Sequence, residues 1–468
     1  MASSNRDQEQ HYHEVFITKT VTVQPPPLVA SPTFLPLSNL DSQCPALMYL
    51  VFFYREPVPA SSSSSSSSSL FSSLKRGLEE ALASWYPAAG RLRLSSHSGK
   101  LTLACRNGTG ALLLQASTTA RISDLGDLSL PNNFVDRLVF RPPLNASLED
   151  TPLVVGQVTK FGCGGYAIGV GTNHALFDGV ANYNFLNAWA GRVAGRRLQA
   201  MPPGQAEPVH DRGRLLEMHG HQHGHDDHFH DPAEFMAIDH LHQLIKQKQD
   251  PIILRNGEEK LVLRTFSVEC AMVSRLKSKA MSGGTAAASN CSSFEVVAAH
   301  MWKARTKALN IPNHRTVCLQ FTVDARGRMH PPLPPSFAGN AFVLSSLLCT
   351  AAELDRLPLA ALVLRIQAAK RAVTHAYVAR YIAALGEAPR TSLPPLPELT
   401  MVSDWTKTPY HRVDFGAGEA AYVAPLATPM PQAAYFMQSP GEAGSVDVRI
   451  GLPEKTLSAF ETYFLHGF

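Results

Sequence analysis

The spacing of apolar side chains near residue 80 is that of a helix with one buried face. In "SSLKRGLEEALASWYP", apolar residues recur every three or four positions until a proline stops the pattern: Leu74, Leu78, Leu82 and Trp85, then Pro87. This spacing predicts a helix that packs against the core. The serines just before it, Ser61 to Ser69, bury no apolar surface, so we expect a mobile surface loop there.

Alternating apolar positions between residues 152 and 175 predict a β-hairpin. Apolar residues share a parity on each side of the glycine-rich "GCGG": Leu153, Val155 and Phe161 before it, Tyr166, Ile168 and Val170 after it. His174 then follows the second strand. Helical spacing resumes at Val180, so Asp178 and Gly179 mark the start of a helix.

The periodic pattern dissolves after residue 197 and reappears after residue 260. Residues 198–260 are rich in Pro, Gly and His, which predicts a linker between domains. Beyond them, "LVLRTFSVECAMVSRLKSKA" predicts a strand and a helix, and "SSFEVVAAHMWKARTKAL" predicts a helix whose capping box is Ser292 with Glu295. Strand-like runs alternate with further helices near residues 316–324, 341–349, 420–423 and 445–452. We therefore expect a mixed α/β protein with an N-terminal domain over 1–197 and a C-terminal domain over 261–468.

Length and charge narrow the class of protein. At 468 residues the chain exceeds one ordinary core, which agrees with two domains of roughly 200 residues each. Its 42 basic and 38 acidic side chains give a formal net charge of +4 and form no basic block. This balance argues against a nucleic-acid binder held by charge, and we expect small-molecule partners.

The N-terminus and the cysteines indicate a cytosolic protein. No apolar run approaches the roughly 18 residues that span a bilayer, and the polar "MASSNRDQEQHYHE" is unlike a signal peptide. The cysteines are scattered and form no Cys-x-x-Cys pair, so we expect buried, reduced thiols at Cys44, Cys105, Cys163, Cys270, Cys291, Cys318 and Cys349.

His174 and Asp178 form a His-x-x-x-Asp pattern at the junction of the predicted strand and helix, in "VGTNHALFDGVANYNF". A neutral imidazole at a strand end suits general-base work near pH 7, because the reference pKa of histidine is about 6.5. The carboxylate can orient the imidazole, cap the helix or pair with a distant basic residue. The pattern alone leaves these roles open, because most isolated matches to it are structural.

Further motifs accompany this pattern in a set order along the chain. They are "SWYPAAGRLR" from Ser84, "VDARGRMHPPLPPSFAGNAF" from Val323 and "VSDWTKTPYHRVDFGAG" from Val402. Together with His-x-x-x-Asp, these motifs resemble those of the plant BAHD acyltransferases, the CoA-dependent branch of the chloramphenicol-acetyltransferase-like superfamily. The resemblance extends from about Glu14 to the last helix.

The resemblance implies a two-domain chloramphenicol-acetyltransferase-like fold, α/β with mixed sheets, and a solvent channel between the domains. Acyl-CoA is expected to enter from one face as a co-substrate and a small alcohol or amine acceptor from the other, with no further cofactor. His174 matches the catalytic histidine in mid-channel. The aspartate that matches Asp178 turns away and pairs with a basic residue to hold the loop in shape, and Lys303 and Arg305 are the candidates for that partner.

The implied mechanism uses His174 to deprotonate the acceptor, which attacks the thioester carbonyl and gives a tetrahedral oxyanion. By resemblance, the indole N–H of Trp405 and the hydroxyl of Ser403 are candidate donors to that oxyanion, in "VSDW" where relatives carry "TSW" or "SSW". Plain core packing is the alternative role for Trp405. No acyl-enzyme is required. The expected enzyme is a monomeric O- or N-acyltransferase with a hydroxycinnamoyl or related donor, active on a plant specialised or lipid metabolite.

The family motif DFGWG occurs here as DFGAG and is expected to support the fold away from the active site. Its matching members are Asp414, Phe415, Gly416 and Gly418. Ala417 replaces the family's tryptophan, so we expect altered local packing. Arg390 lies near the place where some relatives grip a carboxylate, but its surroundings differ, and we interpret it as a solvated loop arginine.

Three further possibilities concern metals and rival functions. Alternating histidines in the linker could bind a metal: His219, His221, His223, His225, His228 and His230. We expect no metal site there, because catalytic zinc needs a rigid scaffold and a second shell of partners. The rival functions are a non-catalytic relative that acts as a partner in a lipid or wax pathway, and a zinc-dependent hydrolase with His174 and Asp178 as ligands.

Overall fold

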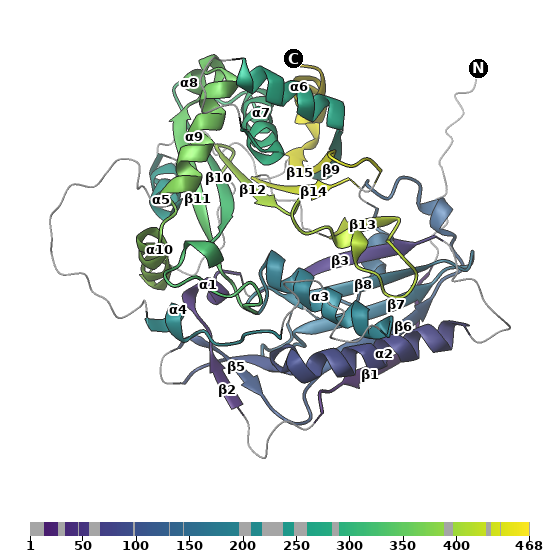
Figure 1. Ribbon diagram of the computed structural model, residues 1–468. Helices are drawn as coiled ribbons and strands as arrows, with labels where there is room; N and C mark the ends of the chain where they lie inside the picture. The colour runs from purple at the N-terminus through teal and green to yellow at the C-terminus, as the bar shows by residue number, and fades with distance from the viewer. Residues whose placement is uncertain are drawn as a thin grey trace, which may run out of the picture.

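The computed structural model describes most of the chain and shows two large β-sheets with helices packed on them (Figure 1). The described residues are 14–26, 33–44, 46–55, 66–96, 99–130, 132–143, 145–195, 207–217, 237–247, 260–282, 290–387, 396–426, 432–439 and 441–467. The expectation of a mixed α/β fold is confirmed. Within the described part of the chain, no helix is both long enough and apolar enough to cross a membrane.

The first sheet has six strands in the order β1-β6-β7-β8-β3-β13. Their bounds are β1 (Phe16–Val23), β3 (Leu47–Tyr54), β6 (Ala111–Ser117), β7 (Val154–Lys160), β8 (Tyr166–Asn173) and β13 (Tyr422–Pro425). The hairpin predicted around "GCGG" is confirmed as β7 and β8, which pair antiparallel with Val155 opposite Gly171. Nearly every residue of this hairpin is buried, because both faces of the sheet are covered.

Two helices cover one face of the first sheet: α2 (Ser66–Ser84) and α3 (Gly179–Val193). Their buried side chains, among them Leu78 and Trp189, share one core with Phe52 of β3. The loop expected for the serine run is wrong for residues 66–69, which form the first turn of α2. Once the apolar face of a helix is packed, one more N-terminal turn costs little, and serine is tolerated at helix starts. Residues 61–65 lie outside the described part of the chain.

The second sheet has six strands in the order β11-β10-β12-β14-β15-β9. Their bounds are β9 (Leu261–Val268), β10 (Thr316–Asp324), β11 (Phe342–Thr350), β12 (Leu399–Asp404), β14 (Ala433–Gln438) and β15 (Val446–Pro453). The predicted strand runs are confirmed, but the sequence pattern missed β12 and β14. Each of these has six residues and lies between two neighbours, so neither shows the clean alternation of a half-exposed strand.

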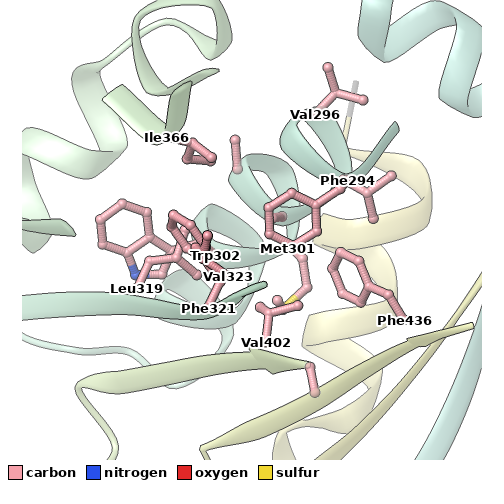
Figure 2. Packing of buried hydrophobic residues seen from close by; sticks show 14 of the residues in the cluster. Phe294, Val296, Met301, Trp302, Leu319, Phe321, Val323, Ile366, Val402 and Phe436 are labelled. Atoms are coloured by element: carbon pink, nitrogen blue, oxygen red, sulfur yellow. The ribbon is translucent and has the colours of Figure 1, made fainter. Parts of the chain in front are cut away.

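Helices cover the outer face of the second sheet, at the top of Figure 1: α6 (Cys270–Met281), α7 (Ser293–Ala308), α8 (Ala351–Arg356), α9 (Leu359–Ala372) and α11 (Leu457–Glu461). The capping box of Ser292 and Glu295 is confirmed at the start of α7. Figure 2 shows how Trp302 of α7 packs over Leu319 and Phe321 of β10. This core holds α7 firmly, because Trp302 is only 1% exposed.

Smaller elements complete the fold. A sheet of β2 (Thr33–Pro36), β5 (Leu101–Cys105) and β4 (Arg91–Leu94) lies in the N-terminal half, and the remaining helices are α1 (Asn39–Ser42), α4 (Gly213–Glu217), α5 (Ala237–Gln247) and α10 (His375–Glu387). The first described stretch of the predicted linker, 207–217, is built into the structure: Val209 forms a β-bridge with Phe337.

The C-terminal half of the chain returns to the first sheet. Strand β13 pairs antiparallel with β3, and Tyr422 lies opposite Phe53. The segment between β12 and β13 therefore runs from the second sheet to the first, and it carries both Trp405 and the DFGAG motif. Residues far apart in the sequence are brought together where it crosses.

The cysteines are all unpaired, and their burial varies. Cys291, Cys318 and Cys349 are buried, as expected, and three others are half-buried. The expectation of burial is wrong for Cys44, which is exposed in the loop that follows α1.

Candidate active site

His174 lies directly after β8, at the end of an interior strand of the first sheet, where it contacts the second half of the chain. Its backbone N–H donates to the carbonyl of Ala46 at 2.8 Å, which extends the pairing of β8 with β3 by one residue. The imidazole is half-buried, and its centroid lies 5.6 Å from the ring of Phe342. The sheet therefore places the histidine, and β11 provides one wall beside it.

Asn340 sets the orientation and the tautomer of the His174 ring. Its Nδ2 donates to the backbone carbonyl of His174 at 2.7 Å and to Asp41 Oδ1 at 3.1 Å. Both of these partners can only accept, so the remaining amide oxygen, Oδ1, is the atom that faces His174 Nδ1 at 3.1 Å. Nδ1 must then carry the ring proton, and Nε2 keeps its lone pair.

A buried ion pair holds Asn340 in place. Asp41 Oδ1 also accepts the backbone N–H of Asn340 at 3.0 Å, and Asp41 Oδ2 accepts Nε of Arg212 at 3.0 Å. Asp41 is fully buried and Arg212 is 3% exposed. Arg212 extends this network by donating to the carbonyl of Ala338, two residues before Asn340. The imidazole is therefore held in place by a chain of hydrogen bonds that joins α1, the 207–217 segment and the loop before β11.

Asp178 lies four residues after His174 and caps the N-terminus of α3. Its Oδ1 accepts the N–H of Ala181 at 2.9 Å, which confirms the predicted helix start at Gly179. Arg326 donates to both carboxylate oxygens, at 2.8 and 3.0 Å. Oδ2 also accepts the N–H of Ala341 at 3.0 Å. The carboxylate is thus bound on all sides by groups that tie it to the loop around residue 340.

Neither expected partner of Asp178 is correct. Lys303 donates instead to the backbone carbonyls of residues 355 and 357, and Arg305 donates to Thr400 Oγ1 and to the carbonyl of residue 397. Both lie on α7, on the far side of the second sheet, whereas Arg326 lies in the turn just after β10. Arg326 lies within the motif "VDARGRMHPPLPPSFAGNAF", which also contains Asn340.

The ion pair decides the charge state of Asp178. Burial acts to raise its pKa, but the guanidinium of Arg326 and the hydrogen bonds that the carboxylate accepts outweigh burial and hold the pKa below its usual 3.8. Burial likewise acts to lower the pKa of Arg326, yet the carboxylates of Asp178 and Asp324 raise it above the usual value for arginine. Both groups are therefore charged at neutral pH.

Trp405 and Ser403 lie at the end of β12 and are bonded to each other. The indole N–H of Trp405 donates to Ser403 Oγ at 2.9 Å. The indole packs against the rings of Tyr410 and Tyr435, whose centroids lie 5.6 and 5.4 Å away. The hydroxyl of Tyr410 donates to the carbonyl of Gly179 at 3.1 Å. Trp405 is thereby tied to the first residue of α3, next to Asp178.

The DFGAG motif forms a tight turn just before β13. Asp414 Oδ1 accepts the backbone N–H groups of Gly416, Ala417 and Gly418 at 2.8, 2.9 and 2.8 Å. Both glycines have positive φ angles, 95° and 82°, which side chains with a Cβ rarely adopt. Phe415 is fully buried, and its ring stacks edge-on against the rings of Phe52 and Trp189, 5.8 and 5.2 Å away.

Two candidates from the sequence, Arg390 and the histidine run 219–230, lie outside the described residues. Across the described ranges, no group of three His, Cys, Asp or Glu side chains could hold a metal ion. The sequence predicts no site role for four residues of this network: Asn340, Asp41, Arg212 and Tyr410. Asn340 and Tyr410 lie within the family-like motifs, whereas no local signal marks Asp41 or Arg212.

Comparison with known proteins places the chain in a family. A family model described as "Transferase family" matches residues 13–466. The chain is 42% identical to brassinosteroid-related acyltransferase 1 of Arabidopsis thaliana over 447 residues, which is 92% of this chain and 93% of that protein. It is 30% identical to omega-hydroxypalmitate O-feruloyl transferase of Arabidopsis thaliana over 433 residues, which is 92% of this chain and 88% of that protein.

Solved structures share the same fold. Vinorine synthase superposes with a TM-score of 0.70 at 19% identity, covering 97% of this chain and 98% of that one. TRI101 of F. sporotrichioides, complexed with coenzyme A and T-2, superposes with a TM-score of 0.71 at 17% identity, covering 92% of this chain and 97% of that one. The family match over nearly the whole chain, together with the plant relatives, shows that this protein belongs to the Transferase family, the BAHD acyltransferases, and is an acyl-transferring enzyme.

Proposed function

We propose that this enzyme transfers an acyl group from acyl-CoA to a hydroxyl or amine of a small plant metabolite, with His174 as the general base. The observation that carries the proposal is the bond between His174 Nδ1 and Asn340 Oδ1. Because Asn340 accepts the proton of Nδ1, the other ring nitrogen, Nε2, is the basic one. A neutral imidazole with one defined basic nitrogen is what proton abstraction from an alcohol or amine requires.

The proposed reaction runs through one tetrahedral intermediate. His174 Nε2 takes the acceptor's proton while the acceptor oxygen or nitrogen bonds to the thioester carbonyl carbon, and the carbonyl oxygen becomes an oxyanion. The intermediate then collapses, the carbon–sulfur bond breaks, and the CoA thiolate takes the proton from the imidazolium. The acyl group thus passes directly to the acceptor, without an acyl-enzyme.

Ser403 is the stronger of the two candidate oxyanion donors. Since the indole N–H of Trp405 is already donated to Ser403 Oγ, it is not available to a second acceptor in this arrangement. The bond polarises the serine hydroxyl, whose own hydrogen remains to be donated. We therefore assign oxyanion stabilisation to Ser403 and the support of Ser403 to Trp405, in place of two parallel donors.

Asp178 acts by positioning and takes no part in proton transfer. Its carboxylate oxygens are bonded to Arg326, Ala181 and Ala341, whereas the imidazole of His174 is bonded to Asn340. The same contacts argue against the zinc hydrolase, because a carboxylate so bound has little capacity left to ligate a metal. Removing metal ions with a chelator should leave acyl transfer unchanged.

The relatives guide the choice of substrates. The names of the two Arabidopsis relatives connect them with brassinosteroids and with the feruloylation of omega-hydroxypalmitate. We propose an aromatic or aliphatic acyl-CoA donor and an acceptor among hydroxylated specialised or lipid metabolites. A small cavity of about 30 Å³ beside Trp405 has room for water only, so the channel that admits both substrates stays a prediction.

The test is an assay of CoA release. Hydroxycinnamoyl, benzoyl and aliphatic CoA thioesters are each paired with alcohols and amines, including a brassinosteroid and an omega-hydroxy fatty acid, and free thiol is measured. With the best pair, His174→Ala should lower the rate by about 100-fold or more at an unchanged melting temperature. His314→Ala, at an exposed histidine, is the matched control and should retain full activity.

Two outcomes would overturn the proposal. If His174→Ala retained a rate within about threefold of the wild type, His174 would not be the base, because a general base contributes far more than that. If the wild-type protein released no CoA with any pair of donor and acceptor, the better hypothesis would be a non-catalytic partner in a lipid or wax pathway.

A further inference from the structure

A second cavity lies on the outer face of the C-terminal half, between α6, α7, the turn from α8 to α9 and the end of the chain. Its volume is about 380 Å³, within the range of small-ligand sites. In Figure 1, these helices cover the side of the second sheet that faces away from α3 and β8. The cavity is therefore separate from the site that contains His174.

Basic side chains from two helices converge on this cavity. On α7, His300, Lys303 and Lys307 recur at intervals of three and four residues and so form one stripe. Lys279 of α6 and Arg356 of α8 also line this cavity. Within the described part of the lining, Asp355 is the only acidic residue. The cavity thus carries a large excess of positive charge.

The lysines retain hydrogen-bonding capacity for a ligand. Lys303 Nζ donates to the backbone carbonyls of residues 355 and 357 at 3.0 and 2.7 Å, which leaves one of its N–H groups. Lys307 Nζ lies 4.7 Å from the centroid of the Tyr463 ring. Among the residues that the structure describes, neither Lys279 nor Lys307 forms an ion pair with a carboxylate.

Helix dipoles do not explain this convergence. Lys279 and Lys307 lie in the last turns of α6 and α7, where a cation stabilises a helix by about 0.3–1 kcal/mol. This stabilisation requires one cation at each helix end. It does not require the two lysines to face the same cavity. The lysines also repel one another: burial lowers the pKa of Lys303, Asp355 raises it, and Lys279 and Lys307 lower it again. An anion in the cavity would relieve that repulsion.

We propose that this cavity binds the phosphate group of a small molecule through Lys279, Lys303 and Lys307. A phosphate is favoured over a carboxylate because lysines offer mobile point charges that surround a compact dianion, whereas carboxylates are best matched by the planar fork of arginine. The proposal is independent of acyl transfer, since none of these residues contacts His174 or its supporting network.

The first experiment measures binding by titration calorimetry on the full chain. The probes are inorganic phosphate, diphosphate and adenosine monophosphate, which separate a free ion from a phosphate ester. We expect binding in the millimolar range or tighter, weakened about tenfold or more by Lys279→Gln with Lys307→Gln. The control pair Lys160→Gln with Lys260→Gln removes the same charge at exposed sites elsewhere and should leave binding within about twofold of the wild type.

The second experiment locates the ligand. Lysines are acetylated with and without the tightest probe, and mass spectrometry reports the protection of each one. Lys279 and Lys307 should be protected, and Lys260 should react equally in both samples. This readout does not depend on the stability of a variant.

Three results would overturn the proposal: no binding of any probe, binding that the Lys279/Lys307 variant leaves unchanged, or protection of lysines outside the cavity. A raised KM for acyl-CoA in that variant would also count against it, because the cavity would then belong to the donor site. A failure of acyl transfer itself would leave these binding results unaffected, so the two proposals fail separately.

Discussion

His174 and Asp178 are four residues apart, yet they are held by different groups. The imidazole of His174 is bonded to the amide of Asn340, and the carboxylate of Asp178 is bonded to the guanidinium of Arg326. An amide can fix the tautomer of an imidazole without adding a charge beside it, whereas the guanidinium keeps the carboxylate charged while it caps α3. His174 and Asp178 therefore have separate roles, and each role depends on a different partner.

Asn340 is expected to act as a positioning residue. Asn340→Ala removes the acceptor of His174 Nδ1 and frees the imidazole to rotate and to change tautomer. We expect kcat to fall by about 100-fold, as for other small misplacements of a catalytic group, with KM nearly unchanged. A fall in melting temperature with unchanged kinetics would instead show a purely structural role.

Asp178→Asn tests the buried ion pair. Asparagine can still cap α3, but the buried Arg326 keeps only the exposed Asp324 as a counter-charge, so the free energy of unfolding should fall by about 3 kcal/mol at pH 7, the lower end of the range for a broken buried pair. Since the folded pKa of Asp178 lies below 3.8, the wild type keeps this stability above about pH 4 and loses it as the pH falls further. Urea unfolding at several pH values should show the gap between the two proteins narrowing below pH 4.

Asp324→Asn is the control for that experiment. Asp324 also contacts Arg326, at 3.2 Å, but its side chain is 53% exposed. An exposed ion pair contributes about 0–1 kcal/mol, so this variant should unfold nearly like the wild type. If both variants lost the same free energy of unfolding, burial of the ion pair would not be the source of its stabilising effect.

At the scale of elements, the DFGAG turn shows how a short motif shapes the backbone. One carboxylate oxygen gathers successive N–H groups, and the two glycines adopt the backbone angles that this requires. The turn then directs Phe415 into the core, and β13 follows it. Ala417 is half-buried, and the bonds to Asp414 do not depend on its side chain.

Asp414→Ala should destabilise the fold more than it affects chemistry. It leaves the N–H groups of the turn without their charged acceptor, a loss of about 1.5–3 kcal/mol for bonds of this kind. Thermal unfolding should show a clear drop, while kcat and KM at low temperature stay near those of the wild type. Glu419→Ala, at an exposed neighbour, is the control. A change in acceptor preference at unchanged stability would place the motif in the substrate site.

At the scale of the whole molecule, the chain crosses between the sheets and returns. Strand β13 comes from the C-terminal half and pairs with β3, and the hydroxyl of Tyr54 donates to the carbonyl of Val413 at 3.1 Å. The domain limits drawn from the sequence and the expected cytosolic, monomeric state stay predictions. Because of this crossing, the N-terminal half depends on a strand from the C-terminal half.

A fragment of residues 1–197 should not fold independently. Without β13 it exposes the edge of β3, and Phe415 no longer covers Phe52 and Trp189. We expect the fragment to aggregate in size-exclusion chromatography and to unfold without a cooperative transition. A monomeric fragment with a sharp melting transition would show that the first sheet is complete without the returning strand.

The family and several of the elements follow from the sequence alone. Hydrophobic spacing located α2, α7 and the hairpin of β7 and β8, and polar residues at helix starts located the caps at Asp178 and Ser292. These features are local, because spacing and capping act within a few residues. The order of the motifs then indicated the acyltransferase family, as the match over residues 13–466 confirms.

Which residues meet around His174 depends on tertiary packing. The bonds from Arg326 to Asp178 and from Asn340 to Asp41 join positions 148 and 299 residues apart. Such contacts depend on how the two sheets pack, and no local pattern encodes that. Lys303 and Arg305 were plausible from charge alone, but α7 presents them to the other side of the second sheet. A basic residue in the sequence is a possible partner of a carboxylate, but the packing of the elements determines whether their side chains are close enough to pair.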